Sequence, residues 1–180
     1  ASMLEKEYKV CSTPKNFNTE MGVTRTILEN LDDHDVFIAE MGAKQKGDIE
    51  FLAKLVKPCY GIITTIGEQH IETFKTLKNI EETKNELPKN IPEDGIMVFN
   101  GDSSSTYKLY KNYTGEKYLA NHKGGFSYAD NIEITSDGSE FDLILGENKT
   151  RVKTKLLGKC NIDNIVSAST LAFLLGIKLE

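Results

Sequence analysis

Two polar residues that could bind a metal ion, Glu40 and His70, each follow a short, dense run of apolar residues. The runs, 35–39 and 60–66, place β-branched and aromatic residues at consecutive positions, which is typical of strands buried on both faces. A helical pattern at 47–57 separates them, and this order predicts a right-handed crossover between neighbouring parallel strands. Ligands of such sheets gather beyond the carboxyl ends of the strands. We therefore expect the carboxylate and the imidazole to meet at one cation.

Each of these residues also has an ordinary interpretation. A carboxylate after a buried strand can cap a helix or form a salt bridge, and most single histidines are satisfied surface or core residues. The pair is stronger evidence for a metal site than either residue alone, because hard cations such as Mg²⁺ prefer oxygen ligands and a histidine can complete or flank such a ligand shell. Both interpretations stay open for Glu40 and His70.

Lys84 belongs to a helical pattern in which it shares one face with Ile80 and Leu87. The side chain should therefore point inward, beside apolar neighbours. A desolvated lysine has a partly neutral amine and can become a reactive or modified group. The alternative is a surface lysine that extends into solvent and pairs with Glu81 or Glu82.

Three asparagines are candidates for cofactor binding, because an amide offers a donor and an acceptor to the edge of a nucleobase. Asn100 follows another buried strand, 95–99, at the expected ligand edge, and Asn161 and Asn164 share a face at the start of the last helix. Turn and cap chemistry is the alternative for all three residues.

The whole pattern predicts an α/β fold in which helices flank a mostly parallel sheet, with a small antiparallel β-meander in the C-terminal third. The meander is expected at about 130–157, because apolar and polar residues alternate there around the hairpin signal Asp137-Gly138. Residues 1–8 look like the end of a helix, and Pro88 should halt the helix 79–87. The other patterns predict elements at 9–12, 21–31, 103–112, 117–121 and 161–175.

Composition excludes several classes of protein. The 180 residues are 39% hydrophobic and 27% charged, as in an ordinary globular domain, and the net charge of −5 argues against a nucleic-acid groove. The longest apolar stretch, 168–177, is too short to span a bilayer, and the N-terminus lacks an apolar signal core. Cys11, Cys59 and Cys160 form no Cys-x-x-Cys pair, so we expect reduced thiols in a cytoplasmic protein.

Five segments, in order and covering nearly the whole chain, resemble sequence motifs of the Mur ligases. These segments are the loop Thr13 to Thr19, Glu40-Met41-Gly42-Ala43 with Gly47-Asp48-Ile49, Gly61 to Phe74 with its Thr-Thr-Ile and His-Ile-Glu, the helix Ile80 to Leu87 with its Lys-x-Glu spacing, and Gly158-Lys159-Cys160-Asn161-Ile162-Asp163-Asn164. One such segment would be weak evidence, but five in register make the resemblance specific.

The resemblance implies an ATP-dependent carboxylate–amine ligase in which residues 1–180 form a partial central, ATP-binding domain. ATP would phosphorylate a peptide carboxylate, and an amine would attack the acyl phosphate. Within the family, the loop 13–19 and the segment 40–43 are most similar to members that join D-alanyl-D-alanine to UDP-N-acetylmuramoyl-tripeptide in peptidoglycan synthesis. Asn16 and Asn18 fall where that loop meets the UDP-sugar substrate.

The same resemblance implies roles for the candidate site residues. Glu40 and His70 match the family's Mg²⁺ ligands. Lys84 matches a lysine that is carbamylated and can then bind a second Mg²⁺. Asn161 matches a residue near the adenine of ATP.

The sequence also departs from the family pattern. The phosphate-binding loop G-x-x-G-K-[ST] does not occur in it, and residues 1–8 resemble the tail of the helix that should follow that loop. Cys160 replaces a histidine and Thr19 replaces an asparagine. The UDP-binding and C-terminal domains of the family are missing as well. We therefore expect an excised piece of the central domain, with negligible ATP turnover of its own.

Other functions fit part of this pattern. Another Mur-type ligase, or a relative of the folylpolyglutamate or cyanophycin synthetases, would use the same motifs on a different substrate. A binding module that kept the fold and lost catalysis would also keep the motifs. An unrelated α/β nucleotide-binding protein would need a glycine-rich phosphate loop, which this sequence lacks.

Overall fold

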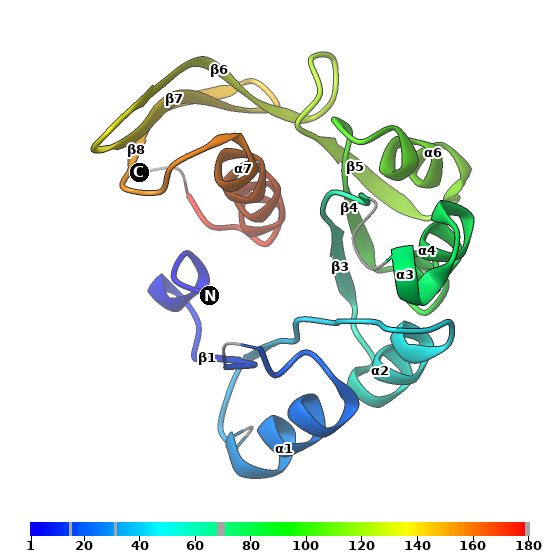
Figure 1. Ribbon diagram of the computed structural model, residues 1–180. Coiled ribbons are helices and arrows are strands. Elements are labelled where there is room, and N and C mark those ends of the chain that lie inside the picture. Colours follow the sequence, from blue (N-terminus) through cyan, green and yellow to red (C-terminus); the bar gives the residue numbers. More distant parts are fainter. Residues whose placement is uncertain (15, 31, 68–70, 179–180) are drawn as a thin grey trace. The chain divides into compact units, whose positions relative to one another are not determined.

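The computed structural model describes residues 1–14, 16–30, 32–67 and 71–178, and the chain divides into two compact units. Unit 1 comprises residues 1–59 and 67–92, and unit 2 comprises residues 60–66 and 93–180. The chain therefore leaves unit 1 to form one strand of unit 2, returns to unit 1, and then completes unit 2. The colours of Figure 1 trace this path along the ribbon.

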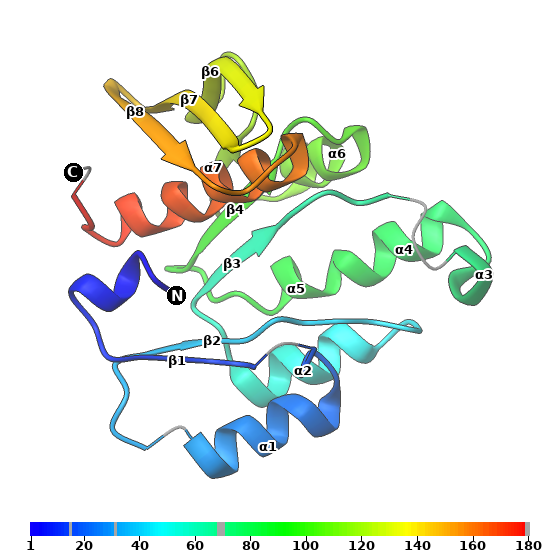
Figure 2. The ribbon, with the colours of Figure 1, turned by 60° about the vertical axis from the view of Figure 1, so that its left-hand side comes forward.

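Unit 1 combines a two-stranded parallel sheet with short helices. Strands β1 (Val10–Ser12) and β2 (Val36–Ile38) pair in parallel, and Figure 2 shows them side by side. The remaining elements of unit 1 are η1 (Leu4–Lys6), α1 (Glu20–Asn30), α2 (Asp48–Val56), α3 (Ile71–Phe74), α4 (Leu77–Lys84) and α5 (Glu86–Lys89). Strands of three residues bury little surface, so the helices supply the core, with Val23, Ile49 and Leu52 fully buried.

Unit 2 is built on a six-stranded sheet in the order β3-β4-β5-β6-β7-β8. Its elements are β3 (Tyr60–Ile63), β4 (Ile96–Asn100), α6 (Ser104–Asn112), β5 (Glu116–Ala120), β6 (Ser127–Thr135), β7 (Gly138–Leu145), β8 (Asn148–Thr154) and α7 (Lys159–Leu174). The pairings from β3 to β6 are parallel, and the last two are antiparallel. Figure 1 shows α6 and α7 on opposite faces of the sheet. The predicted fold class is confirmed.

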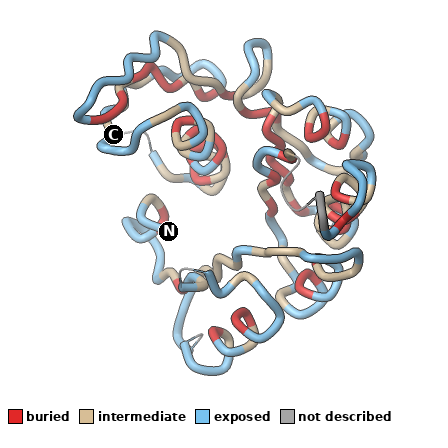
Figure 3. Tube along the Cα trace, viewed as in Figure 1, coloured by how far each residue is buried: buried red, intermediate tan, exposed pale blue. Residues whose placement is uncertain are grey.

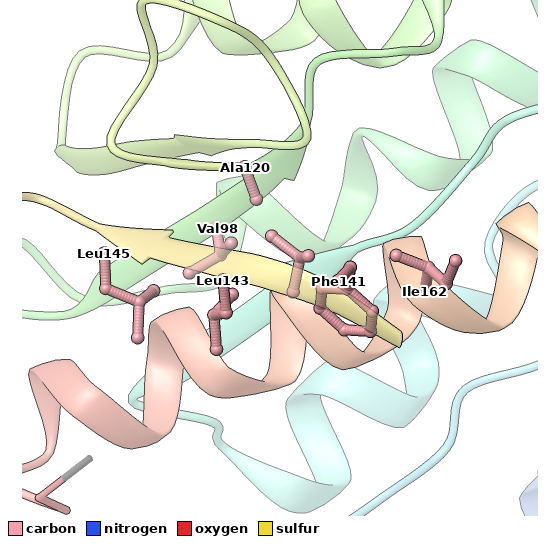
Figure 4. Packing of buried hydrophobic residues seen from close by; sticks show 7 residues of the cluster. Val98, Ala120, Phe141, Leu143, Leu145 and Ile162 are labelled. Atoms are coloured by element: carbon pink, nitrogen blue, oxygen red, sulfur yellow. The ribbon is translucent and has the colours of Figure 1, made fainter. Parts of the chain in front are cut away.

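The core of unit 2 lies between the sheet and α7. Alternate residues of β7, namely Phe141, Leu143 and Leu145, point to the face that α7 covers, where they meet Ile162 and Val166 (Figure 4). Each large apolar side chain buried this completely contributes roughly 1.5–3 kcal/mol to folding. Strand β4 is buried along almost its whole length, as Figure 3 shows, because helices cover both of its faces.

One predicted neighbourhood is wrong. The sequence placed the strand before Glu40 beside the strand that begins at Tyr60, because consecutive strands of a strand–helix–strand unit usually pair. In the structure β2 pairs with β1, and β3 pairs with β4 in the other sheet. The choice between β1 and β3 as a partner for β2 depends on contacts far apart in sequence, which a local pattern does not record.

Two predicted helix boundaries also need correction. Within residues 1–8 the structure has the short 3₁₀-helix η1 in place of an α-helical turn. Pro88 does not halt a helix that runs to residue 87. The helix ends at Lys84, and Pro88 sits in the first turn of α5. A proline is tolerated there because the N–H groups of a first turn have no partner within the helix.

The described residues include no helix that is both long and apolar enough to cross a membrane. All three cysteines are free, with Cys11 buried and Cys59 and Cys160 exposed.

A charged cluster ties the three strands of the meander together. The carboxylate of Asp142 on β7 accepts from Lys149 Nζ at 2.9 Å, from Asn131 Nδ2 at 2.7 Å and from Arg151 at 3.3 Å. These donors, Lys149 foremost, lower the pKa of Asp142 from 3.8 to about 2.

We expect Asp142→Asn to remove a pH-dependent part of the stability of unit 2. The pKa of this carboxyl is lower in the folded state, so its contribution is present above pH 3.8 and is lost as the pH falls toward about 2. Thermal unfolding followed by circular dichroism between pH 2 and 6 should show a smaller acid dependence in this variant. The exposed carboxylate variant Asp94→Asn should match the wild type, and equal slopes for all three proteins would contradict the prediction.

Candidate functional site

Glu40 stands directly beyond β2, and the loop after β1 fixes it there. Its backbone N–H donates to Thr13 Oγ1 at 3.0 Å, and its Oε1 accepts from Asn18 Nδ2 at 3.1 Å. The Glu40 side chain is otherwise exposed to solvent. The polar loop and the strand end therefore form one structure that presents a carboxylate outward.

The segment after Glu40 needs a glycine at position 42 because its backbone lies against Asn18. Its N–H donates to the backbone oxygen of Asn18 at 2.7 Å. A Cβ atom at Gly42 would lie 2.8 Å from Asn18 Cγ, which is closer than real contacts allow. The missing side chain thus permits Asn18 to reach Glu40.

Two acidic residues close the turn between Glu40 and α2. Asp48 Oδ2 accepts from the N–H groups of Lys44 and Gln45 at 2.8 and 3.1 Å. Glu86 of α5 accepts from the N–H of Gly47 at 2.8 Å. Gly47 itself has a φ of 96°, a left-handed conformation that glycine adopts without strain. Glu86 was not among the predicted site residues. The Lys-x-Glu spacing of its motif is the sequence feature that could have identified Glu86 as part of the site.

Lys84, the last residue of α4, is half-buried in the same unit as Glu40. Burial lowers the pKa of its amine, and the negative charge of Glu40 partly opposes this shift. Of the two alternative partners of Lys84, Glu82 forms an ion pair with Lys46 Nζ at 2.9 Å. The structure therefore brings Glu40 together with two other predicted site residues, Asn18 through a hydrogen bond and Lys84 through the interaction of their charges.

His70 lies outside the described residues, so the structure does not place it. Asn16 is exposed in the loop before Asn18. Among the residues described, no three His, Cys, Asp or Glu side chains form a group that could hold a metal ion. The described part of the candidate cation site consists of the Glu40 carboxylate and the neighbouring lysine.

Asn100 is the first of the candidates in unit 2, and its side chain is only 1% exposed. Its Nδ2 donates to Thr65 Oγ1 at 3.1 Å, and its Oδ1 accepts from the N–H of Asp102 at 2.9 Å. Ser103 and Thr106 donate to the backbone oxygens of the neighbouring residues 66 and 64. These contacts favour a positioning role for Asn100, which holds the segment after β3, over direct contact with a cofactor.

Asn161 and Asn164 lie in the first turns of α7, after Gly158. Asn161 is half-buried and donates from Nδ2 to the backbone oxygen of Leu157 at 2.8 Å, whereas Asn164 is exposed. The ammonium of Lys159 joins this helix to the loop after β4 through Asp102 at 2.6 Å. The start of α7, which carries both asparagines, is therefore joined to the loop that follows β4.

Comparisons with known proteins identify the family of the chain. Residues 1–172 match the family of Mur ligase middle domains. The chain therefore belongs to the Mur ligases, and the resemblance seen in its motifs is confirmed.

The relatives indicate a particular branch of this family. The UDP-N-acetylmuramoyl-tripeptide–D-alanyl-D-alanine ligase of Buchnera aphidicola is 32% identical over 182 residues, which cover 100% of this chain and 40% of that ligase. The ligase of the same name from Haemophilus influenzae is 30% identical, over 94% of this chain and 37% of its own.

Solved structures agree. The crystal structure of MurF from Acinetobacter baumannii has a TM-score of 0.92 at 25% identity, covering 99% of this chain and 39% of that one. MurF from Thermotoga maritima in complex with ADP has a TM-score of 0.90 at 26% identity, with coverages of 99% and 42%. The chain spans about two fifths of the length of these relatives.

We expect Gly42→Ala to break the contact between Asn18 and Glu40, because the added methyl group overlaps Asn18 Cγ. Overpacking of this kind should lower the free energy of unfolding by roughly 1–3 kcal/mol. Chemical denaturation measures the loss, and amide NMR shifts of residues 13–18 should move with it. The control is Gly67→Ala, whose Cβ would meet no atom of the described residues within 4 Å. Equal stability of the two variants would contradict this account.

Lys84→Met should change how stability depends on pH. Burial places the pKa of the folded-state amine below its ordinary value of 10.5, so the unfolded chain binds more protons between the two values. Wild-type stability therefore rises with pH through that window, and Lys84→Met should lose the rise and be at least as stable near neutral pH. Denaturation in CO₂-free buffer tests this against Lys78→Met, an exposed lysine of the same helix. A rise retained in Lys84→Met would refute the interpretation.

Proposed function

We propose that the protein containing this chain is an ATP-dependent ligase that joins D-alanyl-D-alanine to UDP-N-acetylmuramoyl-tripeptide, and that residues 1–180 are part of its central domain. The observation that carries the proposal is the match to ligases of this name over the entire chain, at 32% identity in one case. The structural similarity to a MurF bound to ADP supports a nucleotide as the energy source.

The reaction would proceed in two steps. The terminal carboxylate of the tripeptide attacks the γ-phosphorus of ATP, ADP leaves, and an acyl phosphate forms. The amine of D-alanyl-D-alanine then attacks the carbonyl carbon, loses a proton and expels inorganic phosphate. Such chemistry depends mainly on placing the reactants and neutralising phosphate charge.

The residues present fit a magnesium site. Glu40 offers an exposed carboxylate whose orientation Asn18 fixes through one hydrogen bond. The charged form of Lys84 would repel a cation next to Glu40. Because burial favours the neutral amine, Lys84 is suited to form an N–C bond to CO₂ and release one proton to solvent, which leaves an anionic carbamate with oxygen donors. Magnesium, when bound, would supply positive charge to the phosphates. We include His70 as a further ligand on the motif match alone.

The amides divide into two groups in this proposal. Asn161 and Asn164, at the start of α7, would contact the nucleotide, whereas the enclosed Asn100 would keep the segment 64–66 in place. Asn16 and Asn18 would face the UDP-sugar substrate. Since Asn18 also holds Glu40, occupancy of that loop and the position of the carboxylate would be linked.

The complete protein should form UDP-N-acetylmuramoyl-pentapeptide and release phosphate when given ATP, Mg²⁺ and both substrates. We expect Lys84→Ala to lower the rate by about 100-fold or more, the scale of losing one electrostatic contact to a transition state. Lys78→Ala on the same helix is the control and should stay near wild type. The 180-residue chain alone should show no turnover, because it lacks the phosphate loop motif.

Mass spectrometry of the product and a phosphate-release assay report these outcomes. Wild-type turnover in Lys84→Ala would remove that residue from the mechanism. A complete protein that neither binds nucleotide nor ligates these substrates would instead be a binding module that has kept the fold.

A further inference from the structure

Glu86 is a buried carboxylate that the reaction itself does not use. It is the first residue of α5 and only 7% exposed. Its Oε1 accepts from the N–H of Gly47 at 2.8 Å, and its Oε2 accepts from the N–H of Glu50 at 3.0 Å. Each oxygen therefore takes one backbone donor from the start of α2, one from the N-cap residue Gly47 and one from Glu50 in the first turn.

This double contact satisfies both partners. The first N–H groups of a helix have no acceptor within it, and a negative charge is favourable at that end. A buried carboxylate without partners would be strongly destabilising. Glu86 thus joins α2 to the junction of α4 and α5 through charge-assisted hydrogen bonds, across 36 residues or more of sequence.

Both elements joined in this way carry a site residue. Lys84 ends α4 two residues before Glu86, with only Asn85 between α4 and α5. On the other side, the turn that leaves Glu40 runs into α2, and Asp48 closes it through Lys44 and Gln45. The clamp formed by Glu86 therefore lies between the segments that hold Lys84 and Glu40.

We propose that Glu86 is a positioning residue that holds Lys84 beside Glu40, so that the lysine can carry its carbamate there. The carbamate on Lys84 rests on the proposed function, whereas the placement of Lys84 beside Glu40 does not depend on it. A helix cap alone would stabilise α2 and leave the reaction of Lys84 with CO₂ unchanged in the folded protein. A positioning residue would affect that reaction as well.

The neighbouring Glu82 provides a matched control. Glu82 precedes Lys84 by two residues, as Glu86 follows it by two, and each change to glutamine removes one negative charge near the lysine. Glu82 contacts the side chains of Lys46 and Lys78, whereas Glu86 contacts the backbone of α2. A difference between the two variants therefore reports the backbone clamp rather than the charge.

A second variant breaks the clamp from the other side. Glu50→Pro removes the N–H that Glu86 Oε2 accepts, at the third position of α2. Proline is accommodated at the equivalent position of α5, where Pro88 is the third residue. This variant leaves the sequence around Lys84 unchanged and tests the same contact if Glu86→Gln does not fold.

The experiment is ¹³C NMR of the complete protein equilibrated with ¹³C-bicarbonate, at a temperature well below the melting point of every variant. We expect Glu86→Gln and Glu50→Pro to weaken bicarbonate uptake at Lys84 by about tenfold, the scale of losing an outer contact to a ligand residue. Glu82→Gln should stay within about twofold of wild type. Wild-type uptake in both clamp variants would overturn the proposal.

A wild-type protein that shows no carbamate would count against the proposed function and would leave the positioning role to a second readout. That readout is the yield of thiol cross-linking between Glu40→Cys and Lys84→Cys with a reagent of fixed length, mapped by mass spectrometry. The yield should fall when Glu86→Gln is added and persist when Glu82→Gln is added. Equal yields in the two backgrounds would overturn the positioning role.

Discussion

The site in unit 1 depends on one constraint, which is that the backbone N–H groups between β2 and α2 must find acceptors outside any strand or helix. The acceptors are side-chain and backbone oxygens supplied by Thr13, Asn18, Asp48 and Glu86. Because these oxygens come from the loop after β1, from α2 itself and from α5, the irregular segment joins three parts of the unit. Its conformation is therefore set by polar contacts rather than by apolar packing.

The same constraint decides which acidic group faces solvent. Asp48 and Glu86 use their carboxylates to accept backbone N–H groups, whereas the Glu40 carboxylate accepts from the side chain of Asn18 and stays exposed. Unit 2 repeats the arrangement with amides, since Asn100 is enclosed and Asn164 is exposed. In each unit, some polar motif residues build the scaffold and leave others available for a ligand.

Local patterns predicted much of this architecture. Strand β4 and the hairpin of β6 and β7 followed from consecutive apolar residues and from Asp137-Gly138, because neighbouring residues alone encode those features. The half-buried position of Lys84 is consistent with the helical spacing that predicted it. The partner of β2 did not, since a strand of three residues carries too little pattern to distinguish β1 from β3. The place of Pro88 was also missed, because a helix interior and a new first turn look alike in sequence.

The sequence by itself determined the family, the fold class and the set of polar residues that end the strands, since motif spacing and apolar periodicity are properties of short segments. Only the tertiary structure decided which of those residues have their hydrogen bonds satisfied internally. That choice depends on acceptors and donors tens of residues apart, as between Glu86 and the first turn of α2. The sequence alone does not distinguish a carboxylate that caps a helix from one that is free to bind a cation, because the difference lies in the surroundings of the side chain in the fold.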